Sequence, residues 1–477
     1  MNFEQVIGLE VHCELKTNTK MFSAAPVTFG KEPNTMINEV DLGMTGTMPV
    51  LNKRGVEFAI RVCHALHMEI DELLCFDRKN YYYSDLPKGF QITQDKRPIG
   101  KNGYLDIEVD GVVTRVEIER LHMEEDTAKQ FHFDDYSLID YNRAGIPLIE
   151  IVTRPNIRSG AQAAAYLEKL RQMFLYTDVS DAKMEEGSMR CDVNISIRPY
   201  GSETFGTRTE IKNLNSISNV QKAIEFEALR QEKALIQGQP VLQETRRFDE
   251  DSKETVVMRS KGDAVDYKYY TEPNILPVRI DHQWVLDIKN NLPMMADERE
   301  KLYIEKHDLP QTDAHILVSN KEMSDFYEET IQTCSEYKLV CNWLLGEVQA
   351  YLNKENLTIT ETKLTPLYLG KMILLIQDGT ISSKQAKKVF ECLMNEGKDP
   401  EIIIEEKGMK QISDPATLKA IVNEVLDANT QSIEDYAAGK NRAVGFLVGQ
   451  IMKKTGGQAN PKVTNQILIQ LLKERTE

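Results

Sequence analysis

Residues 6–15 alternate between apolar and polar side chains, the pattern of a strand with one buried face. The polar face of this segment presents Glu10, His12 and Glu14. Any polar residue would satisfy a solvated face, whereas a carboxylate, an imidazole and a second carboxylate form a set that can hold a divalent cation. The segment therefore predicts a metal-binding strand.

The same alternation returns at residues 188–198, where Arg190, Asp192 and Asn194 share one face. Two strands that each carry ligand-type residues on one face predict a sheet whose floor holds metal ions and phosphate. That combination is the first indication of an enzyme that uses ATP.

Further acidic residues lie in segments that could extend this floor. Residues 120–126 end in three successive acids, a run that on its own is typical of a solvated surface. Glu150 is the only charge in an apolar strand, so it needs a cation or a donor, and an ion pair with Arg143 is the simplest explanation. The carboxylates expected on one sheet face are those of Glu10, Glu125, Glu150, Asp192 and Glu210. Such a group would repel strongly without counter-ions, and Mg²⁺ shared with nucleotide phosphates is a common solution.

The cations available to face phosphate are Lys79, Lys88, Arg190 and Arg247. Missing motifs argue against other ways of binding a nucleotide or cleaving a bond. The chain has no Gly-x-x-x-x-Gly-Lys-Ser/Thr loop, no dinucleotide fingerprint and no Gly-x-Ser-x-Gly elbow. Cys13 follows His12, but neighbours on a strand point to opposite faces, so we expect this thiol in the core rather than as a nucleophile.

The composition is typical of a cytoplasmic protein with more than one domain. A chain of 477 residues is too long for a single core, and its 41% hydrophobic and 28% charged content is ordinary. The seven cysteines show no CxxC spacing, which indicates reduced thiols and no zinc ribbon. No apolar stretch reaches the ~20 residues of a membrane span, and no secretory signal is expected. The net charge of −16 argues mildly against general nucleic-acid binding.

The periodicity changes along the chain and predicts three domains. Residues 1–292 are expected to form an α+β domain on a largely antiparallel sheet, with helices near 159–176 and 216–236. Residues 293–405 read as an all-helical domain, and residues 406–477 as a small helical tail with a basic surplus. The helices expected in the middle domain span 295–307, 325–337, 339–353, 367–378 and 383–394.

Long motifs in a fixed order closely resemble the B subunit of the tRNA-dependent amidotransferases, the GatB family. The resemblance covers essentially the whole chain and is far more specific than any single short pattern. The segments that carry it are residues 6–12, 76–81, 121–126, 140–150, 184–192, 210–215, 266–273, 445–450 and 457–461.

The resemblance implies a glutamine-synthetase-like cradle domain, followed by the helical domain and the tail. Family members convert glutamyl-tRNA(Gln) to glutaminyl-tRNA(Gln), and often aspartyl-tRNA(Asn) to asparaginyl-tRNA(Asn), in a heterotrimer with an amidase subunit and a small C subunit. The metal ligands that the resemblance implies are Glu10, His12, Glu125 and Glu150, with Glu124, Asp192 and Glu210 either joining them or binding through water. Many relatives carry a zinc knuckle whose cysteines are replaced here, so no zinc is expected. The replacing residues are Ser23, Ala25, Asn38 and Asp41.

The implied chemistry agrees with the acidic floor. A carboxylate does not react with ammonia until ATP has converted it to an acyl phosphate, whose formation needs Mg²⁺ and positively charged side chains. The predicted catalytic residues are Lys79, Arg190 and Glu125. Because the chain offers no glutaminase nucleophile, ammonia is expected from the amidase partner. The polar residues proposed to line its route are Lys88, Glu125 and Asp126.

The tail is the expected tRNA contact, although a solvated helix face would explain its basic residues equally well. The residues concerned are Lys440, Arg442, Lys453, Lys454 and Lys462. Two alternative functions are a non-catalytic tRNA-binding scaffold and a free-standing ammonia-dependent ligase for a small carboxylate. A scaffold does not need strand-borne acids, and a small substrate does not need two helical domains. The amidotransferase hypothesis accounts for both features.

Overall fold

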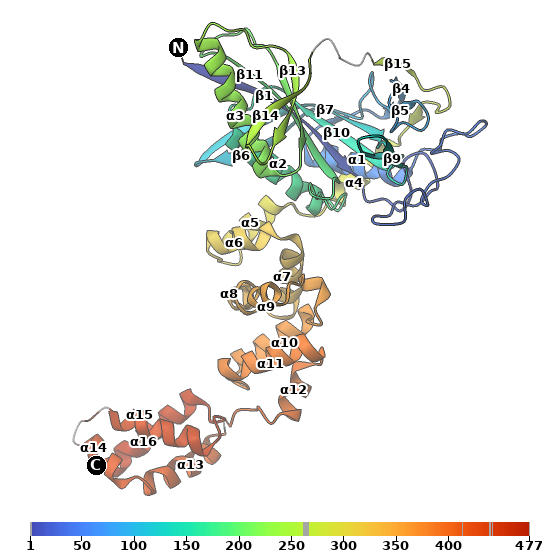
Figure 1. Cartoon of the computed structure of the whole chain (residues 1–477). Coiled ribbons are helices and arrows are strands. Elements are labelled where there is room, and N and C mark those ends of the chain that lie inside the picture. The colour runs from blue at the N-terminus through green and yellow to red at the C-terminus, as the bar shows by residue number, and fades with distance from the viewer. Residues whose placement is uncertain (1, 261–266, 413, 438–439, 441, 477) are drawn as a thin grey trace. The chain divides into compact units, whose positions relative to one another are not determined.

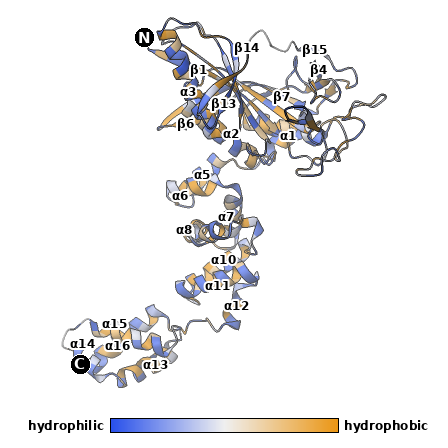
Figure 2. Cartoon of the chain, in the orientation of Figure 1, coloured by the Kyte–Doolittle hydropathy of each residue, from blue (hydrophilic) through white to orange (hydrophobic). Residues whose placement is uncertain are grey.

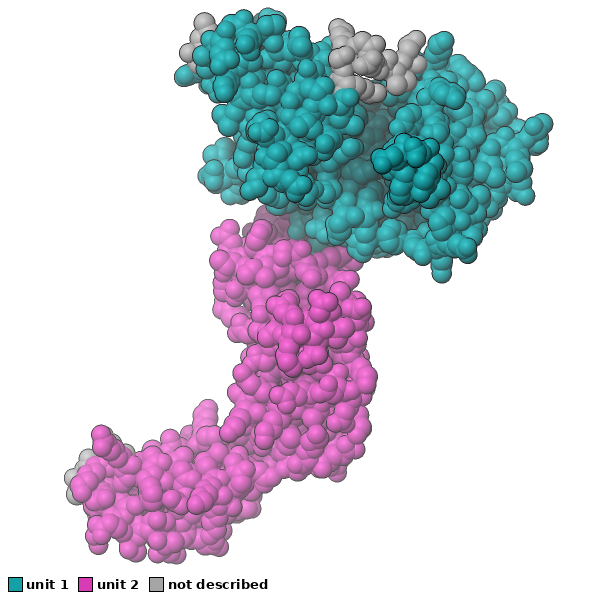
Figure 3. Space-filling model, in the orientation of Figure 1, with its two compact units in different colours: residues 1–295 teal, residues 296–477 magenta. Residues whose placement is uncertain are grey.

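The computed structural model describes residues 2–260, 267–412, 414–437, 440 and 442–476. Contacts divide the chain into two compact units, Met1–Met295 and Ala296–Glu477, which Figure 3 shows in teal and magenta. The predicted division of the second unit at residue 406 stays a prediction. Asp266, the first residue of one family motif, lies outside the described residues.

A nine-stranded sheet forms the centre of the first unit (Figure 1). In their order across the sheet its strands are β14 (Glu254–Ser260), β13 (Glu244–Asp249), β12 (Thr209–Leu214), β11 (Met189–Pro199), β1 (Phe3–Glu14), β10 (Pro147–Thr153), β7 (Val112–Glu125), β6 (Gly100–Val109) and β2 (Glu69–Ile70). The pairs are antiparallel except for β12 and β13, which are parallel. The sheet is therefore mixed, and the α+β class is confirmed.

Three smaller sheets complete the strands of this unit. The first contains β15 (Lys268–Thr271), β4 (Asp77–Asn80) and β5 (Phe90–Thr93). The others pair β16 (Val278–Arg279) with β3 (Leu73–Leu74) and β8 (Lys129–His132) with β9 (Ser137–Asp140). The first of these sheets supplies one wall of the candidate site described below.

The apolar face of β1 is fully buried, as its alternation predicts. Leu9, Val11 and Cys13 have no exposed surface and belong to one core cluster with residues of the helices α1 (Lys53–Ala65), α2 (Gly160–Tyr176) and α3 (Ile217–Ile236). Figure 2 shows how hydrophobic residues follow the strands of the large sheet. Because one face of β1 is sealed in this way, Glu10 and His12 must lie on the other.

The predicted helices of this unit are confirmed at their N-termini. Ser159 and Ser216 cap α2 and α3, each accepting a backbone N–H with its side chain. Two further helices, α1 and α4 (His282–Asn290), were not expected from the sequence. The cap of α1 is Asn52, whose side chain accepts the backbone N–H groups of Arg54 and Gly55.

The second unit is helical in all its described elements. They are α5 (Ala296–Glu305), α6 (Gln311–Ser319), α7 (Lys321–Thr333), α8 (Tyr337–Trp343), η2 (Leu344–Val348), α9 (Gln349–Glu355), η3 (Ile359–Glu361), α10 (Pro366–Gln377), α11 (Ser383–Glu396), α12 (Pro400–Glu406), α13 (Pro415–Asp427), α14 (Thr430–Ala437), α15 (Arg442–Lys454) and α16 (Pro461–Thr476). Leu418, Leu447 and Leu468 belong to a separate core of α13, α15 and α16. Among the described helices, none combines the length and the apolar character that crossing a membrane requires.

Candidate active site on the polar face of the sheet

The polar faces of four neighbouring strands meet at the centre of the large sheet. β1 lies between β10 and β11, with Glu10 opposite Asp192 and His12 opposite Glu150. On the far side of β10, Glu150 is opposite His122 of β7. Residues opposite each other in antiparallel strands project to the same side, so these side chains share one face.

We call His12, His122, Glu124 and Glu150 the histidine cluster. Glu150 Oε2 lies 3.0 Å from Nε2 of His122 and 3.4 Å from Nε2 of His12. Each histidine also has its Nε2 3.8 Å from a carboxylate oxygen of Glu124. Ligand atoms of His12, Glu124 and Glu150 lie within 4.8 Å of one another, close enough to share one metal ion.

Positive charge is scarce in the histidine cluster. Glu124 and Glu150 are buried, and neither forms an ion pair with a lysine or an arginine that the structure describes. Burial alone would raise the pKa of Glu150, but His122 and His12 hold it well below its usual range. Burial likewise opposes charge on His122, yet Glu150 and Glu124 raise its pKa to about 9. The cluster therefore needs a cation, supplied either by protonated histidines or by a bound metal.

We call Glu10, Asp192, Glu210 and Lys212 the lysine cluster. Its three carboxylates also offer oxygens within 4.8 Å of one another. Unlike the first group, it contains an ammonium, because Lys212 Nζ lies 2.5 Å from Asp192 and 3.0 Å from Glu210. Glu10 accepts a hydrogen bond of 2.8 Å from Asn194, and burial together with the neighbouring carboxylates raises its pKa.

A cavity of about 180 Å³ lies above the histidine cluster and is also lined by Glu10. Lys79 of β4 and Tyr269 of β15 reach it from the smaller sheet, and Arg120 reaches it from β7. Lys79 Nζ lies 4.7 Å from the ring centre of Tyr267 and forms no ion pair within the described part of the chain. Burial opposes its charge, but the field of Glu124 and other acidic groups keeps the pKa of Lys79 raised.

Both clusters have donor sets that fit a divalent ion. The carboxylate oxygens of Glu10, Asp192 and Glu210 match the preference of Mg²⁺, although Lys212 competes for the same oxygens. The mixed nitrogen and oxygen set of the histidine cluster also suits Mn²⁺ and similar ions. The observation in favour of a metal there is that the two buried carboxylates have only imidazoles as ion-pair partners among the described residues.

Comparison with known proteins assigns the family. Residues 5–286 match the GatB/GatE catalytic domain and residues 325–472 match the GatB domain. The chain is 55% identical over 475 residues to the B subunit of the aspartyl/glutamyl-tRNA(Asn/Gln) amidotransferase of Staphylococcus saprophyticus, with 100% of both chains covered. It is 54% identical over the same length, again with 100% of both chains covered, to the protein of that name from Bacillus mycoides. The chain belongs to the GatB family.

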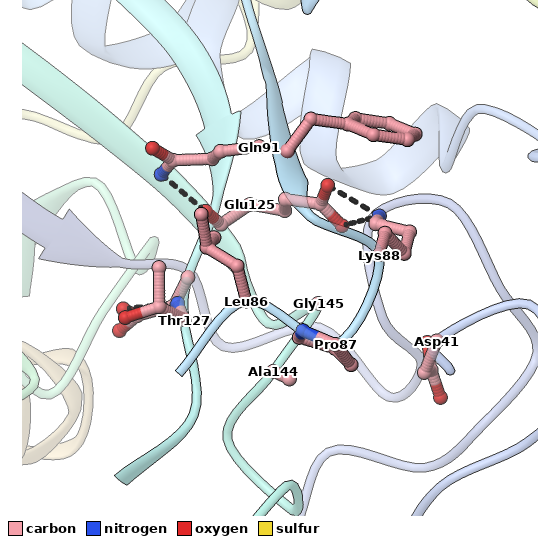
Figure 4. A pocket seen from close by; sticks show the side chains of 11 residues that line it. Asp41, Leu86, Pro87, Lys88, Gln91, Glu125, Thr127, Ala144 and Gly145 are labelled. Atoms are coloured by element: carbon pink, nitrogen blue, oxygen red, sulfur yellow. Dashed lines mark hydrogen bonds and ion pairs between the residues drawn. The ribbon is translucent and has the colours of Figure 1, made fainter. Parts of the chain in front are cut away.

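In this GatB chain the structure corrects one expected neighbour. Glu125 does not share the face of Glu10 and Glu150, because it follows Glu124 directly on β7 and points the opposite way. Its carboxylate accepts hydrogen bonds of 2.6 Å from Lys88 and 3.0 Å from the backbone N–H of Ile92. Figure 4 shows this ion pair in a separate small pocket.

Lys88 is consequently held away from the clusters as well. Figure 4 shows its Nζ directed at the Glu125 carboxylate, while Gln91 donates a 2.7 Å hydrogen bond to the Glu125 backbone carbonyl. Asp41 and Asp126 line the same pocket. The residues predicted for an ammonia route therefore lie together in a pocket of their own, whose lining includes no member of the histidine or lysine cluster.

The simple ion pair suggested for Glu150 is wrong. Arg143 instead donates to the backbone carbonyl of Thr127 at 2.9 Å and lies 3.8 Å from Asp126. Arg190 forms a close ion pair with Asp126, 2.5 Å from Nη2 to Oδ2. Burial would raise the pKa of Asp126, but these two guanidinium groups lower it. The guanidinium of Arg190 is thus paired with Asp126.

The remaining predicted cations lie on more open surfaces. Arg247 of β13 is 47% exposed and lies 3.2 Å from Asp249. The five predicted tRNA contacts of the second unit, Lys440, Arg442, Lys453, Lys454 and Lys462, are all exposed. Two of them already have acidic partners, since Lys440 pairs with Asp435 and Lys454 with Glu424.

The positions that replace the zinc knuckle are joined by hydrogen bonds. Asp41 accepts from Ser23 Oγ at 2.7 Å, from the backbone N–H of Asn38 at 3.0 Å and from buried Lys20 at 3.2 Å. An ion pair therefore occupies Asp41, which is the best metal donor among these residues.

Three residues of the GatB site were missed as site residues by sequence reasoning. His122 and Arg120 precede Glu124 by two and four positions, so strand alternation could have placed them on its face. Lys212 stands two residues after Glu210 and could have been found in the same way. Only the sheet register shows that they lie close to acidic residues of other strands.

Proposed function

We propose that this chain performs the ATP-dependent transamidation of misacylated Glu-tRNA(Gln), Asp-tRNA(Asn) or both. Its full-length similarity to proteins named as B subunits of aspartyl/glutamyl-tRNA(Asn/Gln) amidotransferases is the observation that carries this proposal. The first unit would act as a glutamine-synthetase-like cradle for ATP and the aminoacyl end, and the protein would work in the cytoplasm. The enzyme class is a carbon–nitrogen ligase with glutamine as the amido donor.

The sheet face supports activation of a carboxylate by ATP. The side-chain carboxylate of the misacylated residue attacks the γ-phosphorus, the bond to ADP breaks, and an acyl phosphate forms. Lys79 lines the cavity without an ion pair to any described residue and is best placed to stabilise the transferred group. Arg190, bound to Asp126, would act at the edge of this site. When bound by Glu10, His12, Glu150 and their neighbours, Mg²⁺ would neutralise phosphate charge.

Ammonia then displaces phosphate from the acyl phosphate and gives the amide. We assign its supply to an amidase partner, with a small C subunit completing the heterotrimer. The pocket of Lys88, Glu125 and Asp126 supports a polar route, because a buried ion pair offers both a donor and an acceptor to a neutral amine. Glu125 belongs to this step rather than to the metal site.

The second unit would hold the tRNA. Arg442, Lys453 and Lys462 are exposed and have no acidic partner among the described residues, so they are the strongest candidates for phosphate contacts. Replacing Lys453 and Lys462 by alanine together should raise the tRNA KM a few-fold and reduce its salt dependence. An unchanged salt slope would show that the solvated-face alternative is correct.

Labelled ATP tests the catalytic proposal. The chain, with and without an amidase partner, receives misacylated tRNA, and both γ-phosphate release and amide formation are followed. Glu10→Ala and Glu150→Ala should each reduce both by at least about 100-fold. Glu117→Ala, which changes an exposed acid on β7, is the matched control. Turnover that survives both site changes would leave only the scaffold function.

A further inference from the structure

The cavity above the histidine cluster contains a second cation, Arg120, besides Lys79. Arg120 lies on β7, two residues before His122, and lines the same space of about 180 Å³. Its guanidinium forms no ion pair with any residue that the structure describes, and its Nε atom is buried without a hydrogen-bond partner among them. The cavity thus holds two positive groups whose charge is available to a ligand, one from the smaller sheet and one from the large sheet.

Arg120 differs in this respect from other partly buried arginines of the first unit. Arg78 donates from Nε to Glu272 at 2.5 Å. Arg198 donates from Nε to Glu4 at 2.8 Å. A guanidinium N–H that is removed from water without an acceptor costs free energy. Arg120 is therefore ready to receive an acceptor from outside the chain.

The sheet register places Arg120 in one row with Glu10. Arg120 pairs with Val152 on β10, and Val152 pairs with Glu10 on β1. Side chains opposite each other in antiparallel strands share one face. Because neighbouring strands lie about 4.8 Å apart, the backbones of the outer two residues are roughly 10 Å apart. The row therefore has an anion-binding group at one end, a metal-type ligand at the other, and an apolar side chain between them.

A substrate carboxylate that enters this cavity meets mostly negative charge. Glu10, Glu124 and Glu150 all line it, so a further carboxylate is stable only beside a positive group. Lys79 is the candidate for stabilising the transferred phosphoryl group, which leaves Arg120 for the carboxylate. A guanidinium can bind both oxygens of a carboxylate in one plane, and this geometry also fixes the direction of the attacking lone pair.

We propose that Arg120 binds the side-chain carboxylate of the misacylated residue and holds it for attack on the γ-phosphorus. One carboxylate oxygen forms the bond to phosphorus, the bond from phosphorus to the ADP oxygen breaks, and ADP leaves with that electron pair. Arg120 keeps its proton throughout. The amide product is neutral and has one acceptor oxygen in place of two, so it binds this group more weakly than the substrate does. The inference rests on the proposed function, which supplies the carboxylate.

The test compares substrate and product tRNA. The probe is tRNA(Gln) with glutamate or tRNA(Asn) with aspartate, whichever the wild-type complex amidates, joined through a stable 3′-amide link. The reference is the same tRNA with the corresponding amide residue. Binding to the full chain is measured with Mg²⁺ and a non-hydrolysable ATP analogue. The wild type should prefer the acidic form at least about tenfold.

Arg120→Gln should remove this preference, while its affinities for the amide form and for the ATP analogue stay as in the wild type. Arg120→Lys keeps the charge without the planar fork and should retain only part of the preference. Arg115→Gln, which changes an exposed arginine of the same strand, is the matched control and should behave as the wild type. Unchanged binding of the amide form also shows that a variant is folded.

The inference is overturned if the wild type shows no preference, if Arg120→Gln keeps it, or if this variant loses affinity for the ATP analogue instead. Should Arg120→Gln bind neither tRNA, the decision passes to Arg120→Lys, and an undiminished preference in that variant overturns the inference. Amide formation by the wild-type complex in these cases would leave the proposed function intact and remove only the role of Arg120. A wild-type complex that forms no amide would remove the proposed function itself.

Discussion

The histidine cluster and the lysine cluster lie side by side on one sheet, yet they balance their negative charge differently. In the lysine cluster, the Lys212 ammonium lies against Asp192 and Glu210. In the histidine cluster, Glu124 and Glu150 have only imidazoles as ion-pair partners among the described residues. A lysine is charged at every physiological pH, whereas a histidine can lose its proton.

This difference indicates which site depends more on a metal ion. A divalent cation entering the lysine cluster must displace an ammonium that already satisfies two carboxylates. In the histidine cluster it need only replace protons, because neutral imidazole is itself a metal ligand. We therefore expect the histidine cluster to bind its ion more tightly and to be less tolerant of substitution.

The largest expected effect compares Glu150→Gln with Glu210→Gln. Glu150 contacts both histidines, so its loss should lower amide formation by at least about 100-fold. Glu210→Gln leaves Glu10 and Asp192 with the Lys212 ammonium, and a loss of about tenfold is expected. Both variants are assayed with the partner subunits under saturating ATP. Equal losses of amide formation would show that the two clusters are equally sensitive to the loss of one carboxylate.

A smaller effect is expected when the lysine cluster is made to resemble its neighbour. Lys212→Met leaves three carboxylates with oxygens within 4.8 Å and removes their ammonium. Without metal, like-charge repulsion should lower the melting temperature, and added Mg²⁺ should restore it. Mn²⁺ titration should show binding at this cluster about tenfold tighter than in the wild type.

Lys222→Met serves as the control for this substitution because Lys222 is exposed on α3. It should change neither the melting temperature in chelator nor the Mn²⁺ affinity. If Lys212→Met behaves in the same way, the ammonium does not compete with a metal at this position.

The smallest effect concerns pH in the chelated protein. The pKa of His122 is about 9 in the fold and ~6.5 in an unfolded chain, so the folded state binds more protons between these values. The stability from this ion pair is complete below about pH 6.5 and is lost as the pH rises through about 9. The melting temperature in chelator should fall by a few degrees over that interval. His122→Asn should weaken this dependence and leave the part due to His12, whose pKa is raised by Glu150 and Glu124 against the effect of burial. An unchanged dependence would assign it to another group.

Much of the site followed from strand alternation. The pattern of residues 6–15 placed Glu10 and His12 on one face and Cys13 in the core, as the structure shows. The two helices expected near 159–176 and 216–236 were likewise predicted from local signals, and the structure has them as α2 and α3. In contrast, α1 and its Asn52 cap were not predicted.

The errors arose where residues from different strands had to be matched. Glu125 was expected on the face of Glu150, but the register places His122 opposite Glu150, puts Glu124 on that same face, and leaves Glu125 beside Lys88. Arg143, only seven residues before Glu150, pairs with Asp126 instead. Distance along the chain is a poor guide here, because a one-residue change in register exchanges the two faces of a strand.

The sequence by itself determined which residues can act as ligands, which strand faces are polar, and the family to which the chain belongs. Tertiary structure alone decided that His122 and Lys212 join the carboxylates, and that Lys88 and Glu125 form a pocket of their own. The physical reason is that a period of two is a local property of the backbone, whereas pairing between distant strands depends on the packing of the whole sheet.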